Sequence, residues 1–210
     1  MSFETLSQTV IKGDMQAAAE LTRKALDDGA DAQQILDQGL IAAMDVVGRK
    51  FAEGAMFVPQ MLRSAKTMQQ CVEVLKPHFQ GAGMTTKGTI ILGTVKGDLH
   101  DIGKNLVAMM LEGAGFRIVD LGVDVSPAAF VEAVAKENGQ IVGMSALLST
   151  TMPAMAETIT ALTTAGHRET VKIMIGGAPV TADYATSVGA DCYAPDAGSA
   201  VTEAKRLLDV

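Results

Sequence analysis

Five short, apolar, β-prone runs alternate with helical segments in the C-terminal part of the chain, and this alternation constrains the fold more than any other feature. The runs have no polar face, so each strand is expected to be buried on both sides, which is typical of a parallel sheet covered by helices. We therefore predict an α/β domain over residues 85–210 with a flavodoxin-like (Rossmann-type), five-stranded parallel sheet. The expected strands are "TIILGTV", "FRIVDLG", "QIVGMSA", "VKIMIGG" and "DCYAP", and the expected helices cover residues 102–114, 127–138, 152–165, 181–188 and 198–209.

The first part of the chain has a helical period instead. Apolar residues recur every three or four positions in "DMQAAAELTRKALDDG", "DAQQILDQGLIAAMDVVGRKF" and "MFVPQMLRSAKTMQQCVEVLKPHF". Together with a short helix near residues 3–11, these segments predict an all-α cap bundle of about four helices over residues 1–84. The stretch "QGAGMTTKG", residues 80–88, marks the domain boundary because small, flexible residues replace the helical period there. One apolar stripe is expected in the second long segment: Ile35, Leu36, Leu40, Met44, Val47 and Phe51.

Composition and charge argue against several classes of protein. The 210 residues carry a net charge of -7 and no basic run, whereas a nucleic-acid partner would require a basic surface to bind its phosphates. No apolar stretch approaches the roughly 20 residues of a membrane helix, and the N-terminus has no basic and apolar leader. Cys71 and Cys192 lie far apart, so we expect two reduced thiols in a cytoplasmic protein.

The loop after the first expected strand, "KGDLHDIG", places His100 between Asp98 and Asp101. In a parallel sheet, ligands bind outside the carboxyl ends of the strands, where this loop lies. The glycines do not match a phosphate-binding loop, and three clustered residues in one short loop are poorly arranged to hold one metal ion. Both of these interpretations are weak, and the residues alone favour two others. His100 is a structural or exposed histidine, or it is the single axial ligand of a metal already held by a macrocycle, with Asp98 accepting its second ring N–H.

Three short motifs together resemble a known family. D-x-H-x-x-G spans residues 98–103 after the first expected strand, whereas S-x-L (145–147) and G-G (176–177) close the third and fourth expected strands. This combination and its spacing are similar to those of the cobalamin-binding domain of corrinoid proteins and methionine synthase. The segment "KFAEGAMFVPQMLRSAKTM" resembles the helical cap that precedes that domain, so the likeness covers nearly the whole chain. The chain looks most like the small corrinoid proteins of methyltransferase systems that use methylamines, methanol or methoxy compounds.

The resemblance implies a cobalamin whose benzimidazole is displaced, with His100 as the lower ligand of cobalt in its place. Asp98 would accept the other ring N–H, and the hydroxyl of Thr151, where the family more often has Ser, would complete the relay. Phe51, Val58 and Met61 of the cap would shield the upper face of the corrin. The implied cofactor-binding residues are Asp98, Leu99, His100, Asp101, Ile102, Gly103, Ser145, Leu147, Ser149, Thr151, Gly176, Gly177, Phe51, Val58, Met61, Tyr193 and Ala194, with His100 as the metal ligand.

The same resemblance implies a methyl carrier in one-carbon metabolism that is not catalytic on its own. Cobalt(I) would accept a methyl group from a substrate:corrinoid methyltransferase, and a second methyltransferase would deliver it to tetrahydrofolate or coenzyme M. A reductive activating protein is the third implied partner. The alternative is a cobalamin-dependent sensor or regulatory module, which the lack of a basic helix disfavours. An adenosylcobalamin-dependent isomerase would need a barrel for its radical reaction, and the pattern contains none.

Overall fold

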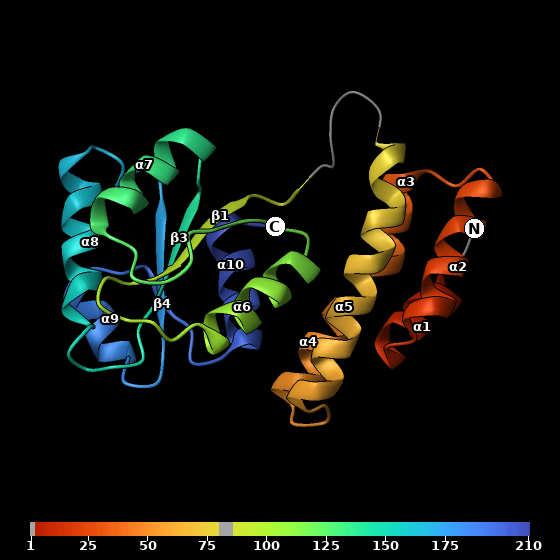
Figure 1. The fold of residues 1–210 in the computed structure, drawn as a ribbon, viewed down its shortest axis with the longest axis horizontal. Coiled ribbons are helices and arrows are strands. Elements are labelled where there is room, and N and C mark those ends of the chain that lie inside the picture. Colours follow the sequence, from red (N-terminus) through yellow and green to blue (C-terminus); the bar gives the residue numbers. More distant parts are fainter. Residues whose placement is uncertain (1–2, 80–85) are drawn as a thin grey trace. The chain divides into compact units, whose positions relative to one another are not determined.

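The structure is a computed structural model that describes residues 3–79 and 86–210, and the chain divides into two compact units (Figure 1). The first unit comprises Met1–Thr86 with Gly113–Gly115, and the second comprises Lys87–Glu112 with Phe116–Val210. The domain boundary expected between residues 84 and 85 lies outside the described residues. It therefore stays a prediction.

The first unit is helical, as predicted. Asp14 and Asp31 each begin a helix, because their side chains accept the backbone N–H of Ala17 and Gln34 respectively. Three segments follow one another without a break and form the long second helix of the prediction, with a π-helical stretch in its middle. The elements are α1 (Glu4–Lys12), α2 (Met15–Asp27), α3 (Ala32–Gln34), η1 (Ile35–Ile41), α4 (Ala42–Ala52), α5 (Val58–Leu75) and the 3-10 turn η2 (Lys76–His78).

The predicted apolar stripe of this long helix forms part of the core. Phe51, at its C-terminal end, is only partly buried and is the exception. Gly39 lies inside the π-helical stretch, where a Cβ would be 3.0 Å from a methyl carbon of Leu6. A glycine there lets α1 pack closely against the stripe. The fully or nearly fully buried members are Ile35, Leu36, Leu40, Met44 and Val47.

The second unit alternates strands with helices, and every predicted strand and helix is present. In residues 86–210 five parallel strands form one sheet in the order β2-β1-β3-β4-β5. This is the strand order of the predicted flavodoxin-like fold. The strands are β1 (Thr89–Thr94), β2 (Arg117–Asp120), β3 (Ile141–Ser145), β4 (Lys172–Gly176) and β5 (Cys192–Tyr193); the helices are α6 (Ile102–Gly113), α7 (Pro127–Glu137), α8 (Pro153–Thr164), α9 (Ala182–Val188) and α10 (Ala197–Leu208).

The strand order makes two loops neighbours. β1 pairs with β2 on one side and with β3 on the other, so the chain changes direction across the sheet at β1 and β3. Figure 1 shows α7, α8 and α9 on one face of the sheet and α6 and α10 on the other. Because parallel strands end at the same edge, the loops that follow β1 and β3 lie side by side at this switch point, the usual ligand site of such sheets.

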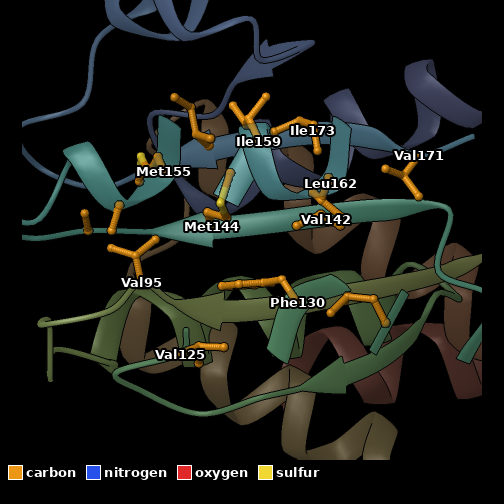
Figure 2. Close-up of a cluster of buried hydrophobic side chains, with 14 of the residues drawn as sticks. Val95, Val125, Phe130, Val142, Met144, Met155, Ile159, Leu162, Val171 and Ile173 are labelled. Carbon is orange, nitrogen blue, oxygen red and sulfur yellow. The ribbon is translucent and has the colours of Figure 1, made fainter. Parts of the chain in front are cut away.

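The main core of the second unit lies between the sheet and the layer that contains α7 and α8 (Figure 2). Val142 and Ile173 of the strands pack in one cluster with Phe130 of α7 and Leu162 of α8. Gly93 of β1 borders this cluster, and a Cβ on it would lie 2.8 Å from Cζ of Phe130. The absence of a side chain at Gly93 therefore makes room for the fully buried phenyl ring.

The structure also bears on two expectations from composition. Cys71 and Cys192 are both free thiols, as expected. Within residues 3–79 and 86–210, no helix combines the length and the apolar character needed to cross a membrane.

Gly93→Ala is expected to lower the free energy of unfolding by about 1–3 kcal/mol, because its methyl group would force the Phe130 ring to shift. Urea unfolding of the purified protein, followed by circular dichroism, measures the change. Gly103→Ala is the matched control, since a Cβ there would have no neighbouring atom within 4 Å. Equal stability of Gly93→Ala and the unaltered protein would contradict the packing described here.

Candidate functional site

A tight turn after β1 turns the side chain of Asp98 into the protein. The backbone N–H of Asp98 donates to the carbonyl of Val95 at 3.1 Å, and Gly97 at the third position of the turn has φ +84°. A type II turn requires positive φ at this position, which explains the glycine. The side chain of Asp98 is fully buried, whereas the next two residues, Leu99 and His100, are exposed.

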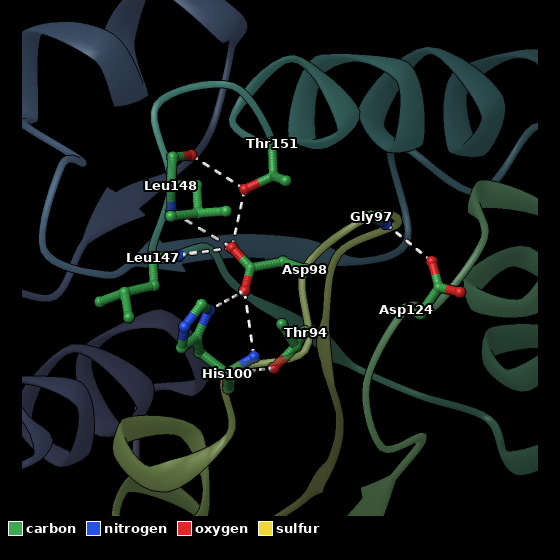
Figure 3. A network of polar contacts seen from close by, with 8 residues as sticks. All are labelled: Thr94, Gly97, Asp98, His100, Asp124, Leu147, Leu148 and Thr151. Carbon is green, nitrogen blue, oxygen red and sulfur yellow. Dashed lines mark hydrogen bonds and ion pairs between the residues drawn. The ribbon is translucent and has the colours of Figure 1, made fainter.

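Asp98 joins the loops that follow β1 and β3 (Figure 3). Its Oδ1 accepts the backbone N–H of His100 at 3.1 Å and pairs with the ring Nδ1 of His100 at 2.8 Å. Its Oδ2 accepts the backbone N–H groups of Leu147 at 2.7 Å and Leu148 at 3.2 Å, and the hydroxyl of Thr151 at 2.7 Å. One buried carboxylate thus satisfies donors from two neighbouring loops, and the contacts that the resemblance implied between Asp98, His100 and Thr151 are present.

These contacts set the charge of Asp98 and the tautomer of the His100 ring. Burial opposes ionisation of the carboxyl, but the hydrogen bonds from Thr151, Leu147 and His100 outweigh it and hold the pKa of Asp98 well below its ordinary value. Asp98 is therefore a carboxylate at neutral pH. Because a carboxylate only accepts hydrogen bonds, Nδ1 of His100 carries the proton of that contact. Nε2 is then the nitrogen that can bind a metal.

Exposed apolar residues occur in the loop of His100, at the start of α6 and in the loop after β3. The side chain of His100 is 51% exposed. Among residues 3–79 and 86–210 there is no group of three or more His, Cys, Asp or Glu side chains that could hold a metal ion. A metal at Nε2 would therefore take most of its ligands from a bound group, and we call the exposed apolar residues of these segments the apolar rim. The exposed apolar residues of this rim are Leu99 (70%), Ile102 (87%), Leu147 (43%) and Leu148 (43%).

The glycine pair at the end of β4 is required by the sheet itself. A Cβ on Gly177 would lie 1.9 Å from the carbonyl oxygen of Ala146, and Gly177 has φ +125°. A Cβ on Gly176 would lie 2.7 Å from the carbonyl oxygen of Ala194. Backbone groups after β3 and β5 thus approach too closely for any side chain, before a ligand is considered.

Other predicted residues of the second unit lie at or near the carboxyl ends of the strands. Ser145 ends β3 opposite Gly176 in β4, and Ser149 is exposed in the next loop. Tyr193 of β5 is partly buried, and Ala194 follows it with 8% exposure. Gly103 lies in the first turn of α6 with open space around it. Their contacts with a cofactor stay predictions.

The three predicted cap residues differ in accessibility. Met61 is fully buried, Phe51 is partly buried, and Val58 is 40% exposed at the start of α5. Phe57, which directly precedes Val58 and was not predicted, is 71% exposed. In the sequence, the aromatic residue directly before Val58 and Pro59, where a helix begins, could have indicated that Phe57 is an exposed N-cap residue. The predicted contacts of Phe51, Val58 and Met61 with a corrin stay predictions.

Further contacts hold the loop of His100, and sequence reasoning missed them. The hydroxyl of Thr94 donates to the carbonyl of His100 at 3.0 Å. Lys104, with only 3% exposure, donates through Nζ to both carboxylate oxygens of Asp120 at the end of β2. The signal in the sequence is a lysine in the first turn of a helix, where the helix dipole disfavours a cation. The Lys104–Asp120 pair attaches the start of α6 to the sheet.

Comparisons with known proteins agree with the motifs. Residues 88–204 match the B12 binding domain, and residues 2–76 match a second domain with the same description. A trimethylamine corrinoid protein of Methanosarcina mazei is 43% identical over 204 residues, which are 96% of this chain and 94% of that protein.

Two solved structures have similar folds along nearly the whole chain. A methanol:cobalamin methyltransferase complex from Methanosarcina barkeri superposes with a TM-score of 0.89 and 31% identity, covering 97% of this chain and 78% of that one. A cobalamin-binding protein from Desulfitobacterium hafniense superposes with a TM-score of 0.81 and 32% identity, covering 98% of both chains. The likeness therefore includes the helical unit as well as the sheet.

Asp98→Asn is expected to lower the free energy of unfolding of the purified protein by about 3 kcal/mol at pH 7, because an amide cannot accept all the donors that face the carboxylate. The folded-state pKa of Asp98 lies below its unfolded value of about 3.9, so its stabilisation is present above that pH. It is lost as pH falls through the folded pKa. The difference in free energy of unfolding between Asp98→Asn and the unaltered protein, called the gap below, should therefore narrow below about pH 4.

Denaturant unfolding at a series of pH values between 7 and 3 measures this gap. Glu132→Gln, which makes the same change at an exposed position of α7, is the control and should stay within about 0.5 kcal/mol of the unaltered protein. A gap for Asp98→Asn that is absent, or that does not change with pH, would count against an ionised, hydrogen-bonded Asp98.

Proposed function

The chain belongs to the family of proteins built on the B12 binding domain, and from this premise we propose that it holds a corrinoid cofactor and carries a methyl group between partner methyltransferases. The observation that carries the proposal is the half-exposed ring of His100, whose Nδ1 is held by a buried carboxylate at the switch point of the sheet. A histidine held in this way by a second group is typical of a metal ligand.

In this proposal Nε2 of His100 would coordinate the cobalt of the cofactor in place of its benzimidazole. Asp98 and Thr151 keep the imidazole in one tautomer and one orientation through their hydrogen bonds. A bound corrinoid supplies a cobalt centre that can take up and release a methyl group. The contribution of the chain is to bind this group, to orient it through His100, and to shield it from water.

The apolar rim favours a large, flat ligand next to His100. Exposed Leu99, Ile102, Leu147 and Leu148 would lose contact with water beneath such a ligand, and burial of apolar surface yields about 25 cal/mol per Å². We propose that the nucleotide tail lies beside the ends of β3, β4 and β5, and that cap residues cover the upper face. The residues assigned to the tail are Ser145, Ser149, Gly176, Gly177, Tyr193 and Ala194, and those assigned to the cap are Phe51, Val58 and Met61.

We propose three partners for the loaded protein. A methyltransferase that binds the methyl donor would load the carrier, and a second would pass the group to tetrahydrofolate or coenzyme M. A reductive activating protein would return the cofactor to its reactive state. The support is that one relative is named a trimethylamine corrinoid protein, and that a similar structure is a methanol:cobalamin methyltransferase complex. The chain would then be a carrier subunit that needs these partners for turnover.

His100→Ala is expected to alter the visible absorption spectrum after loading with hydroxocobalamin, because the imidazole can no longer coordinate the cobalt. Loading of both proteins at equal concentration, followed by absorption spectroscopy and electron paramagnetic resonance of the cobalt(II) state, provides the measurement. His78→Ala, at an exposed histidine of the helical unit, is the matched control and should reproduce the unaltered spectrum. Identical spectra for His100→Ala and the unaltered protein would refute the ligand assignment.

Methyl loading is expected to require a matching methyltransferase and its donor. The reduced, loaded protein is mixed with a trimethylamine methyltransferase and trimethylamine, and the absorbance of cobalt(I) is followed. It should disappear at least tenfold faster than in a mixture without donor. A methanol methyltransferase with methanol is the comparison that assigns the donor class. Cobalt(I) absorbance that persists with every donor and methyltransferase pair would contradict a methyl carrier.

A further inference from the structure

Asp124, in the loop between β2 and α7, contacts the turn before His100 at two points. Its carboxylate Oδ1 accepts the backbone N–H of Gly97 at 2.7 Å, and its own backbone N–H donates to the carbonyl of Asp98 at 3.0 Å. Figure 3 shows Asp124 reaching Gly97 from a different side than Leu147, Leu148 and Thr151 reach Asp98. The turn is therefore held from both neighbouring loops.

The backbone around Asp124 is fixed to β1 on both sides. The N–H of Val125 donates to the carbonyl of Thr94 at 3.0 Å, and the N–H of Thr94 donates to the carbonyl of Gly122 at 3.0 Å. Between these contacts Asp124 has φ +53°, a left-handed conformation that Asp and Asn tolerate better than most residues. Asp124 thus combines two properties: a backbone that can take this conformation and a side chain with an acceptor.

We propose that Asp124 is a positioning residue for His100, a role that rests on the proposed function of His100 as a metal ligand. Gly97 and Asp98 are consecutive, so an acceptor that fixes the N–H of Gly97 also fixes the direction in which the Asp98 side chain leaves the turn. Asp98 in turn holds both the backbone and the ring of His100. The far end of the same loop is held by Lys104 and Asp120. Asp124 therefore restrains the near end of the loop through its hydrogen bond with Gly97.

Three substitutions separate the two properties of Asp124. Asp124→Asn keeps an acceptor oxygen and the tolerance of positive φ, and it removes only the charge. Asp124→Gly keeps the backbone freedom and removes the acceptor. Asp124→Ala removes both. Because Asp124 is exposed, these substitutions leave the core of the unit intact.

The first measurement is backbone amide hydrogen exchange in the cofactor-free protein. In Asp124→Gly, the amides of Gly97 and His100 should exchange about fivefold faster than in the unaltered protein, the factor expected for loss of one ordinary hydrogen bond. Asp124→Ala should show at least the same increase, and Asp124→Asn should stay within about twofold. The amide of Val142 in β3 should be unchanged in all three, which distinguishes a loosened loop from a destabilised domain.

The second measurement is the histidine-on fraction after loading with hydroxocobalamin, read from the absorption spectrum. It should fall in Asp124→Gly and Asp124→Ala and be retained in Asp124→Asn. If Asp124→Gly matches Asp124→Asn in both the exchange of His100 and the spectrum, the positioning role is wrong. If instead the unaltered protein and His100→Ala give the same spectrum, the proposed ligand is wrong, and the amide exchange still decides whether Asp124 restrains the loop.

Discussion

The buried carboxylate of Asp98 is the interaction on which the site depends. A carboxylate removed from water costs several kcal/mol unless its oxygens are fully hydrogen-bonded. Asp98 meets this requirement with donors from its own loop and from the loop after β3. Each of the two loops therefore needs the other in place to adopt its conformation. The orientation of the His100 ring is therefore a consequence of how β1 and β3 pair. A change in the register of these strands would leave both the carboxylate and its donors unsatisfied.

The topology of the sheet explains why this arrangement forms at the carboxyl ends of β1 and β3. β1 and β3 are neighbours although α6, β2 and α7 separate them along the chain. Their C-terminal loops meet at the switch point, and the glycine pair after β4 allows the backbone of Gly177 to approach Ala146 there. The same residues that form the proposed site thus complete the packing of this edge. Substitutions among them are expected to affect folding as well as cofactor binding, which is why the proposed tests include measurements on the cofactor-free protein.

A histidine that is anchored on one side and accessible on the other suits the carrier role that we propose. Nδ1 of His100 is held by Asp98, while about half of the side-chain surface is exposed, and exposed leucine and isoleucine residues lie in the adjoining segments of the chain. In the function that we propose, the protein contributes a fixed imidazole and an apolar surface, and the reactivity comes from the bound corrinoid and the partner enzymes. Asp124 and the Lys104–Asp120 pair extend this anchoring to both ends of the loop.

The sequence by itself determined the elements of the fold, because helical and strand periods are local properties that neighbouring residues express together. It predicted the helical bundle, the five parallel strands and the family, and through the resemblance it paired His100 with Asp98 and Thr151. Only the tertiary structure decided that Leu147 and Leu148 donate to Asp98, that Asp124 holds Gly97 from 27 positions away, and that Met61 is buried while Phe57 is exposed. The physical reason is that such contacts join residues far apart in the chain. Their partners are set by loop conformations that exist only after the strands have paired.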